Sequence, residues 1–463
     1  MMKLSGTLVL VLGIGESGLA MARWCARQGA RLRVADTRDH PPGLERLRHM
    51  LPAVEVVAGV FEDSLLDGVG LVAVSPGLDL RDALPRRARE RGIPVVGEMT
   101  LFAAALASDP SYRGRVVAIT GTNGKTTTTA LCEALFRATG LDAVAAGNIS
   151  PAALDVLCDR LEAGRALPEC WVLELSSFQI ESMQGLHPDV AAVLNVSDDH
   201  LDRHGDLDRY AAIKAGVFAG HGVQVLNRDD VRVRAMALPG RSALTFGTST
   251  PADGEFGLIQ RDGVTWLARG DVPLLDCCRL RIVGRHNQLN ALAALALGEA
   301  LGLPLAPMLE ALPRFDGLAH RMAVVGVRAD GVTYYDDSKG TNIGATIAAL
   351  EGVGRSVVLI AGGDGKGQDF SALREPLARH ARAVVLIGRD AQAIGSAVAT
   401  PALEVVFAAG MTEAVARANA LARPGDAVML SPACSSLDMF RNYAERGDVF
   451  TDAVRALPEV LQS

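Results

Sequence analysis

The feature that most constrains the fold of this chain is a regular alternation between short apolar runs and segments rich in Ala, Leu and Arg. The runs are rich in Val and almost wholly apolar, which is typical of parallel strands buried on both faces. Strands that alternate with helices predict an α/β architecture. The apolar runs occupy residues 8–12, 32–36, 71–75, 116–120, 171–176, 190–196, 357–363, 383–388 and 427–432.

One stretch, residues 240–283, departs from this alternation. Three short apolar segments, 245–247, 264–266 and 280–283, are separated there by turn residues and predict a small antiparallel patch.

Two stretches are candidate domain boundaries. Residues 97–115 lead into a fresh strand, and Pro313 and Gly317 lie in a second break over 313–323. The length of 463 residues is enough for about three domains of ~150 residues each. We therefore predict three α/β units, residues 1–97, 98–317 and 318–463.

Composition argues against several classes of protein. The formal net charge of -7 argues against a generic binder of nucleic acids or acidic membranes. No apolar run approaches the ~18 residues of a membrane span. The seven cysteines are odd in number and lack C-x-x-C spacing, which is typical of reduced, mostly buried thiols in a cytosolic protein. We expect a cytoplasmic protein without a nucleic-acid partner.

A glycine fingerprint follows the first apolar run. Gly13, Gly15 and Gly18 spell G-x-G-x-x-G, a pattern that lets the backbone approach a diphosphate at a helix N-terminus. Asp36 follows roughly 20 residues later, where a nicotinamide-dependent dehydrogenase would bind ribose. The fingerprint alone is weak evidence, and it leaves an NAD-dependent oxidoreductase open.

The strongest motif lies at residues 119–135, where a buried strand runs into a Gly-Thr-Asn-Gly-Lys-Thr loop and then a helix. Backbone N–H groups and the helix dipole of such a loop bind phosphate, its Lys reaches the β/γ-phosphates, and its hydroxyl ligates Mg²⁺. Ile119 stands where the full motif has its first glycine, so the loop is a shortened form. We predict nucleotide binding by Gly121, Thr122, Asn123, Gly124, Lys125, Thr126 and Thr127.

Acidic residues and histidines gather after two further strands. Glu174 ends one run, and His200 lies in a segment that also contains acidic residues. A carboxylate and an imidazole at the ends of parallel strands can hold Mg²⁺. We predict metal binding by Glu174 and His200, and roles as helix caps and solvated turn residues for Asp198, Asp199, Asp202, His204 and Asp206.

Polar side chains in the last two units complete the pattern. Asn287 and Asn290 share one helical face, where amides can read adenine, although a helix-capping role fits equally well. Asp337 can bind ribose hydroxyls, and Lys339 can approach a γ-phosphate. Lys366 is the candidate cation for a substrate carboxylate.

Together these motifs resemble those of the Mur ligase family, the ATP-dependent amide-bond formers of peptidoglycan synthesis. The resemblance covers essentially the whole chain, in which GTNGKTT, ELSSFQIE, NVSDDHLDRH, GRHNQLNALAA, HRM, DDSKGTN, GGDGKGQDF and LSPACSSLDMF follow in the family's order. DTR, SPG and GNIS, with GGDGKG and SPACSSLD, favour the addition of D-glutamate over that of meso-diaminopimelate or lysine.

The resemblance implies a fold, a reaction and its partners. Rossmann-like N- and C-terminal domains would flank a central P-loop-type ATPase domain. ATP would phosphorylate the alanine carboxylate of UDP-N-acetylmuramoyl-L-alanine, and the amine of D-glutamate would attack the resulting acyl phosphate. ATP and two Mg²⁺ ions are the implied cofactors, and we expect a monomer.

The resemblance also implies roles for individual residues. The first domain would bind the UDP precursor, not NAD, through Gly15, Glu16, Ser17, Asp36, Thr37, Arg38, Ser75 and Gly77, with Asn148 nearby. Beyond the phosphate loop, ATP would contact Asn287, Asn290, Arg321 and Asp337. Glutamate would contact Thr341, Lys366, Ser436, Leu437 and Tyr443, the last standing where the family is expected to have Phe. The catalytic residues would be Lys125, His200, Lys214 and Lys339, and the metal ligands Thr126, Glu174, His200 and Lys214.

Lys214 depends wholly on this resemblance. Its sequence context alone predicts an exposed lysine on a helix. The family implies that it is carbamylated, which turns a cation into an anion able to orient Mg²⁺.

Four alternatives stay open at this point. They are another Mur ligase, an amide ligase like folylpolyglutamate synthase, an NAD-dependent oxidoreductase, and a nucleotide-binding regulator without catalytic activity. The residues alone do not decide between D- and L-glutamate.

Overall fold

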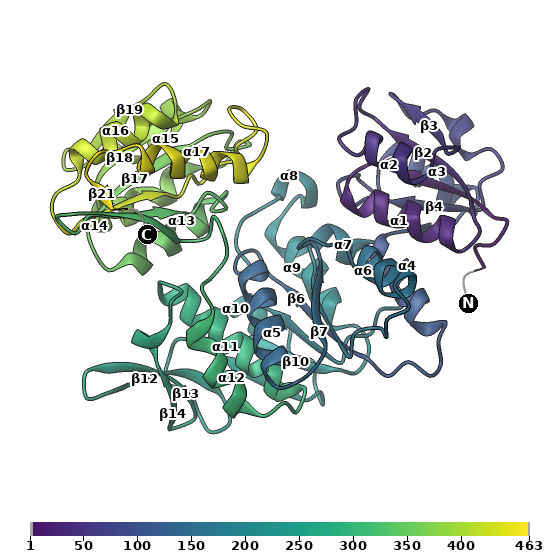
Figure 1. The fold of residues 1–463 in the computed structure, drawn as a ribbon, viewed down its shortest axis with the longest axis horizontal. Coiled ribbons are helices and arrows are strands. Elements are labelled where there is room, and N and C mark those ends of the chain that lie inside the picture. The colour runs from purple at the N-terminus through teal and green to yellow at the C-terminus, as the bar shows by residue number, and fades with distance from the viewer. Residues whose placement is uncertain (1–2, 462–463) are drawn as a thin grey trace.

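The computed structural model describes residues 3–461, without the side chain of Asp202. Three parallel-rich β-sheets, each covered by helices, follow one another along the chain (Figure 1). In the view of Figure 1 the first and last units both lie above the central one, on opposite sides. The predicted α/β class is therefore confirmed.

The first sheet has five parallel strands in the order β3-β2-β1-β4-β5. Its central strand, β1, is apolar and buried because helices cover both faces of the sheet. The strands are β1 (Leu8–Leu12), β2 (Arg31–Asp36), β3 (Glu55–Ala58), β4 (Leu71–Val74) and β5 (Val95–Val96). The helices are α1 (Glu16–Arg27), α2 (Leu44–Met50) and α3 (Ala83–Glu90).

The second sheet has nine strands in the order β14-β13-β12-β11-β10-β9-β6-β8-β7. Its strands are β6 (Arg115–Thr120), β7 (Ala143–Gly147), β8 (Cys170–Glu174), β9 (Val190–Val193), β10 (Val223–Asn227), β11 (Ala243–Phe246), β12 (Phe256–Arg261), β13 (Val264–Arg269) and β14 (Val272–Asp276). Strand β6 pairs in parallel with both β8 and β9, so the loops after these three strands lie at one edge of the sheet. Ligands of open α/β sheets bind at such an edge.

The helices of the central unit cover both faces of this sheet. They are α4 (Glu98–Ala107), α5 (Lys125–Ala138), α6 (Ala153–Glu162), α7 (Ser177–Glu181), α8 (Leu201–His204), α9 (Leu207–Ala215), α10 (Val231–Arg234), α11 (Arg285–Ala300) and α12 (Leu305–Ala311). Helix α11 packs against α5, and the apolar side chains between them belong to one buried cluster.

The predicted antiparallel patch exists, but its extent was partly wrong. Strands β12, β13 and β14 pair antiparallel, whereas β11, which contains Thr245 and Phe246, pairs in parallel with β10 and β12. Residues 280–283 form no strand. Ile282 is apolar because its side chain packs into the central core just before α11, without sheet pairing. Strand β14 was missed.

The third sheet has seven strands in the order β19-β18-β17-β20-β16-β15-β21. Strands β16 to β20 pair in parallel, and β15 pairs antiparallel with β16 and β21. The strands are β15 (Ala323–Arg328), β16 (Thr333–Asp336), β17 (Val357–Gly362), β18 (Ala381–Ile387), β19 (Glu404–Phe407), β20 (Ala427–Leu430) and β21 (Val460–Leu461). The helices are α13 (Ile343–Val353), α14 (Arg374–His380), α15 (Ala391–Val398), α16 (Met411–Leu421) and α17 (Tyr443–Arg455).

The cysteines and the helices of the described chain each add one observation. Six of the seven cysteines are buried and all seven are unpaired, which confirms the expectation of mostly buried thiols. Within residues 3–461, none of the helices combines the length and the apolar character that crossing a membrane requires.

Candidate active site

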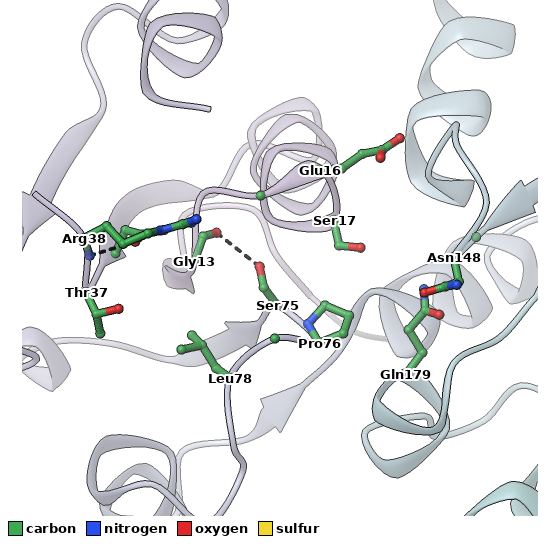
Figure 2. A pocket seen from close by; sticks show the side chains of 14 residues that line it. Gly13, Glu16, Ser17, Thr37, Arg38, Ser75, Pro76, Leu78, Asn148 and Gln179 are labelled. Carbon is green, nitrogen blue, oxygen red and sulfur yellow. Dashed lines mark hydrogen bonds and ion pairs between the residues drawn. The ribbon is translucent and has the colours of Figure 1, made fainter. Parts of the chain in front are cut away.

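A cavity of about 450 Å³ lies at the carboxyl edge of the first sheet, against the central unit (Figure 2). All nine residues predicted to contact the UDP precursor line it, and Figure 2 shows Asn148 and Gln179 reaching it from the central unit. The predicted residues are Gly15, Glu16, Ser17, Asp36, Thr37, Arg38, Ser75, Gly77 and Asn148. Tertiary structure therefore brings together residues from four separate stretches of the chain.

Each of the three fingerprint glycines stands at its position for a different physical reason. A Cβ at Gly18 would lie 1.9 Å from the carbonyl oxygen of Gly13, so Gly18 allows α1 to pack against the preceding loop. Gly13 has a φ of +90° and faces Ser75, whose hydroxyl donates to the Gly13 carbonyl at 3.1 Å. A Cβ at Gly15 would meet no atom within 4 Å, so this glycine faces open space in the cavity.

Asp36 is already engaged by its own domain. Its carboxylate accepts from the N–H of Ile14 at 2.7 Å and from the Arg38 guanidinium at 2.8 Å. Burial opposes ionisation, but the Arg38 side chain and the backbone donors together lower the pKa of Asp36 to about 2. Asp36 thus holds Arg38 at the cavity. In a nicotinamide-dependent dehydrogenase the corresponding carboxylate would instead be available to bind ribose hydroxyls.

Hydrogen bonds connect residues of this cavity to the central unit and to the edge of its sheet. Ser150 donates to Glu16 at 2.7 Å, and the side-chain amide of Asn148 donates to Oε1 of Glu174 at 2.6 Å. Because Glu174 ends β8, Asn148 connects the first cavity to the edge of the central sheet.

The phosphate loop lies between β6 and α5, as predicted. The side chain of Asn195, just after β9, accepts from the N–H of Asn123 at 2.8 Å and donates to its carbonyl oxygen at 3.0 Å. The carbonyl of Asn195 accepts from the N–H of Thr122 at 3.0 Å. Asn195 therefore holds the loop in shape, a role that the analysis of the sequence missed although it lies in the quoted NVSDDHLDRH motif.

The first turn of α5 is left available for an anion. Its N-cap residue is Gly124, with a φ of +82°, and no side chain in the described part of the chain caps the helix. Uncapped N–H groups and the positive end of the helix dipole favour a phosphate group at this position. A Cβ at Gly124 would lie 2.4 Å from Oδ1 of Asn290, so the loop also packs against α11.

Two lysine ammonium groups share one carbonyl oxygen beneath this loop. Lys125 and Lys214 each donate from Nζ to the carbonyl of Gly121 at 2.9 Å. Burial lowers the pKa of both lysines, and Glu174 and Asp199 oppose both shifts. Repulsion from Lys125 lowers the pKa of Lys214 further, and repulsion from Arg321 lowers that of Lys125. Lys214 is 1% exposed, so the expectation of an exposed lysine was wrong: α9 turns it inward onto the phosphate loop.

The positive charge extends to two further residues. Glu174 interacts electrostatically with Lys125, Lys214, Lys339 and Arg321. Burial, reinforced by repulsion from Arg321, lowers the pKa of Lys339 to about 8. These four cationic side chains outnumber the carboxylates that interact with them, Glu174, Asp199 and Asp337, and anionic ligands would balance the remaining positive charge.

The donor set fits a magnesium ion at Glu174. Oε2 of this residue is buried without a hydrogen-bond partner in the described part of the chain, whereas Oε1 is held by Asn148. An orphaned carboxylate oxygen beside a phosphate loop suits a hard cation such as Mg²⁺. The Thr126 hydroxyl, the other predicted oxygen ligand, accepts from the Arg321 guanidinium at 2.5 Å.

The segment around His200 contains one residue in the capping role predicted for it, while metal binding by His200 stays a prediction. His200 is half-buried at the N-cap of α8, with a φ of +54°, and Nε2 lies 3.6 Å from a carboxylate oxygen of Asp199. Asp206 caps α9 by accepting from the N–H of Arg209, as expected. No group of three or more His, Cys, Asp or Glu side chains suited to a metal exists among the described residues.

His204 was expected to be a solvated turn residue, and this was wrong. It is 1% exposed and stacked between Phe178 and Tyr210, with ring centroids 5.2 Å away on each side. Burial, together with the nearby cations, lowers the pKa of His204 to about 4, so the ring is neutral at neutral pH. Phe178 also touches His200, and the Tyr210 ring lies under the Lys214 ammonium. This aromatic column therefore connects two predicted catalytic residues.

Asn287 and Asn290 lie on one buried face of α11, as predicted. Their amides bond to each other at 3.1 Å, and Asn290 Oδ1 also accepts from the Thr128 hydroxyl. The Asn287 amide donates to the carbonyl of Val283. Their proposed contact with adenine stays a prediction.

A second cavity, of about 1020 Å³, lies between the central and C-terminal units. Its lining includes the five residues predicted to bind glutamate and also His200. The five are Thr341, Lys366, Ser436, Leu437 and Tyr443. Within the described residues, no carboxylate forms an ion pair with the Lys366 ammonium, which is exposed at this cavity.

Tyr443 has a contact that its sequence position did not reveal. The Lys339 ammonium lies 3.7 Å from the centroid of the Tyr443 ring, a cation–π contact, and the Tyr443 carbonyl accepts from the Ser338 hydroxyl. Asp337 is buried and accepts a hydrogen bond from Ser431 at 2.8 Å, and burial raises its pKa to about 7.

Two hydrogen bonds hold the C-terminal unit against the phosphate loop. Arg321 donates to Thr126, and the side-chain amide of Asn342 donates to Oδ1 of Asn123 at 3.0 Å. Residues more than 190 positions apart therefore meet at this loop. The arrangement can bind a nucleotide between the two units, next to a cavity with an unpaired lysine.

Three family models match the chain, one for each unit. They are described as the Mur ligase MurD-like N-terminal domain over residues 7–97, the Mur ligase middle domain over residues 119–298, and the Mur ligase glutamate ligase domain over residues 320–434. Relatives named UDP-N-acetylmuramoylalanine–D-glutamate ligase include that of Aromatoleum aromaticum, 61% identical over 100% of both chains, and that of Nitrosospira multiformis, 52% identical over 98% of this chain and 97% of its own.

Solved structures are similar in fold. The UDP-N-acetylmuramate-alanine ligase of Thermotoga maritima has a TM-score of 0.62 at 20% identity, covering 97% of this chain and 99% of its own. A pseudomurein peptide ligase of Methanothermus fervidus has a TM-score of 0.54 at 18% identity, covering 92% and 96%. At these identities the likeness concerns the fold alone.

Proposed function

The chain belongs to the Mur ligase family, and from that premise we propose that it joins D-glutamate to UDP-N-acetylmuramoyl-L-alanine in a reaction driven by ATP. Mur ligases are ATP-dependent amide-bond-forming enzymes. The full-length relatives at 61% and 52% identity, named for addition of D-glutamate, support this choice of substrates.

The observation that carries the chemistry is the sharing of one carbonyl oxygen by Lys125 and Lys214. Two ammonium groups in contact with one oxygen repel each other, and burial denies them water. Conversion of the Lys214 amine to an anionic carbamate, or an incoming polyphosphate, would relieve this repulsion. Transfer of a γ-phosphoryl group gathers negative charge, so cations already placed around the loop stabilise it without rearrangement.

The proposal assigns the acid to the first cavity and the amine to the second. In the proposal the precursor binds the first cavity, with its diphosphate at the N-terminus of α1 and Arg38 bordering the uracil. Glutamate binds the second cavity, where Lys366 and Ser436 hold its side-chain carboxylate. Its amine would then attack the acyl phosphate formed on the alanine carboxylate.

We propose that one Mg²⁺ ion is held by Thr126 and a second by Glu174 and His200, and that carbamylated Lys214 orients Mg²⁺. When bound, the ions supply charge neutralisation for phosphoryl transfer. Burial lowers the pKa of Lys214 and so favours its uncharged amine, which is the form that reacts with carbon dioxide to give a carbamate and a proton. Carbamylation stays a prediction, which the mass of the intact protein under bicarbonate would test.

The alternative of an NAD-dependent oxidoreductase has no support in the geometry, because Asp36 is occupied by Ile14 and Arg38. A phosphate-release assay tests the ligase directly. ATP, the precursor and one amino acid are mixed, with D-glutamate, L-glutamate, L-alanine, lysine or meso-diaminopimelate, each against a blank without amino acid. Release that D-glutamate alone stimulates is expected; stimulation by another amino acid, or by none, would overturn the proposal.

A further inference from the structure

Glu98 is a buried carboxyl group at the junction of the first two domains, and the proposed reaction does not use it. It is the first residue of α4 and is 1% exposed. Oε2 accepts a hydrogen bond from the Ser17 hydroxyl at 2.8 Å, and Oε1 accepts from the N–H of Leu154, in the first turn of α6, at 3.3 Å. Glu98 therefore lies directly behind Ser17, which lines the first cavity (Figure 2).

The charged groups around Glu98 provide it with no cation. Asp155 of α6 faces it and disfavours its ionisation. Arg23 of α1 and Arg46 of α2 are bound to Asp155, at 3.3 and 3.6 Å. Among the described residues, no lysine, arginine or histidine forms an ion pair with Glu98 itself.

Helix α7 also packs against α4, and it adds no free cation. On α7 the titratable residue is Glu181, which pairs with Arg203 at 2.9 Å. Burial raises the pKa of Glu98 to about 7, while the Ser17 hydroxyl and backbone N–H groups of α6 oppose this shift. Both protonation states are therefore accessible to Glu98 near neutral pH.

The Ser17 hydroxyl has a single proton and two competing acceptors. In this structure it donates that proton to Glu98. A diphosphate at the N-terminus of α1 would bring phosphate oxygens, which are strong acceptors, to the same side chain. An ionised Glu98 cannot donate in return, and two anions would then compete for one proton.

We propose that Glu98 takes up a proton when the diphosphate of a uridine nucleotide binds the first cavity, so that the Ser17 hydroxyl turns from Glu98 to a phosphate oxygen. The protonated carboxyl then donates to Ser17 Oγ, and the Ser17 proton passes to the phosphate hydrogen bond. One proton enters from solvent and no covalent bond to carbon or phosphorus changes. The inference rests on the proposed function, because that function places a diphosphate in this cavity.

Coupling to a proton has a defined thermodynamic consequence. At pH values above the pKa that Glu98 has in the ligand-free protein, binding of the precursor must take up as much as one proton. The affinity for the precursor therefore falls by up to about tenfold for each pH unit. Glutamine at position 98 can donate to Ser17 at every pH. E98Q should therefore bind the precursor with an affinity that changes little with pH and, at about pH 8, more tightly than the wild type.

Isothermal titration calorimetry of the full-length protein measures the proton directly. UDP-N-acetylmuramoyl-L-alanine is titrated at about pH 8 in two buffers of different ionisation enthalpy. Its diphosphate is a diester and exchanges no proton in this range. We expect uptake of more than about half a proton by the wild type and a clearly smaller uptake by E98Q. D155N is the matched control for the neighbouring carboxyl group and should keep the uptake of the wild type.

Three results would overturn the inference. Binding to the wild type without proton uptake contradicts it while leaving the proposed function intact, and so does equal uptake by wild type and E98Q. If the precursor does not bind at all, the proposed function fails and the inference fails with it. S17A, which keeps Glu98 but removes the relay, should also lose the uptake, and it provides the test should E98Q not fold.

Discussion

Replacing Lys366 by methionine isolates the recognition of the amino acid. Methionine keeps much of the side-chain length but removes the charge. Because no carboxylate among the described residues pairs with Lys366, the change leaves no orphaned anion in the protein. We therefore expect no measurable loss of stability, and a defect confined to the binding of glutamate.

The size of this defect follows from the exposure of the ammonium group. A charge-assisted hydrogen bond contributes about 1.5–3 kcal/mol. Lys366 is exposed at the cavity, where water screens the charge, so the lower end of this range applies. About 1.5 kcal/mol corresponds to a rise of roughly tenfold in KM for D-glutamate, with kcat changed by less than about twofold.

The assay is phosphate release at saturating ATP and precursor, with D-glutamate varied. D-glutamine provides a substrate-side test, because its side chain has no charge for Lys366 to bind: wild type and K366M should use it with about the same KM. R374Q controls for a general loss of positive charge, because Arg374 is exposed nearby on α14 but does not line the cavity. A KM for D-glutamate within about twofold of the wild type would refute the role of Lys366.

Three further changes test the phosphate loop, the aromatic column and the cation–π contact. G124A should raise the KM for ATP at least about tenfold, because the left-handed backbone costs ~1–2 kcal/mol and the new Cβ meets Asn290. H204F should make the stability of the protein depend less on pH in the acid range. The pKa of His204 is higher in the unfolded chain than in the folded protein, so the wild type loses about 1.4 kcal/mol of stability per pH unit as the pH falls from 6.5 towards 4. Urea unfolding at several pH values would show this loss. Y443L should lower kcat about fivefold, the equivalent of ~1 kcal/mol from its contact with Lys339.

Control variants and contradicting results follow for these changes. Gly140 has a φ of +90° after α5 with open space around it, so G140A has similar backbone strain without the clash and should leave the KM for ATP unchanged. An identical pH dependence in H204F and wild type would mean that His204 is not the buried neutral base. Y443F keeps the ring and should retain the kcat of the wild type; equal losses in both variants would assign the effect to the hydroxyl group.

Much of the architecture was predictable because it is local. The nine apolar runs all became strands, with ends within a few residues of the prediction, since a Val-rich segment buried on both faces shows its burial in its own composition. The loop before α5 was predictable for a related reason. Glycines and a lysine at fixed spacing between a strand and a helix indicate its conformation, which Asn195 then holds through hydrogen bonds.

The wrong predictions concern residues whose apolar or polar side chains are compatible with more than one structural environment. Leu280 and Ile282 are apolar because they pack against the central core, and a short apolar run does not show whether it also pairs with a strand. His204 and Lys214 looked like surface residues because both are polar and lie on short helical segments. Their burial results from the packing of α7, α8 and α9 against one another, which no local pattern reports.

The sequence by itself determined the elements, their α/β order and the chemistry that each strand end carries, because these depend on residues adjacent in the chain. Only the tertiary structure decided which of those ends meet. Arg321 reaches Thr126, Asn148 holds one oxygen of Glu174 and leaves the other open, and Glu98 lies behind Ser17. Charge, desolvation and hydrogen bonding act through space over a few ångströms, so their balance at a site is set by the distances that folding creates and not by separation along the chain.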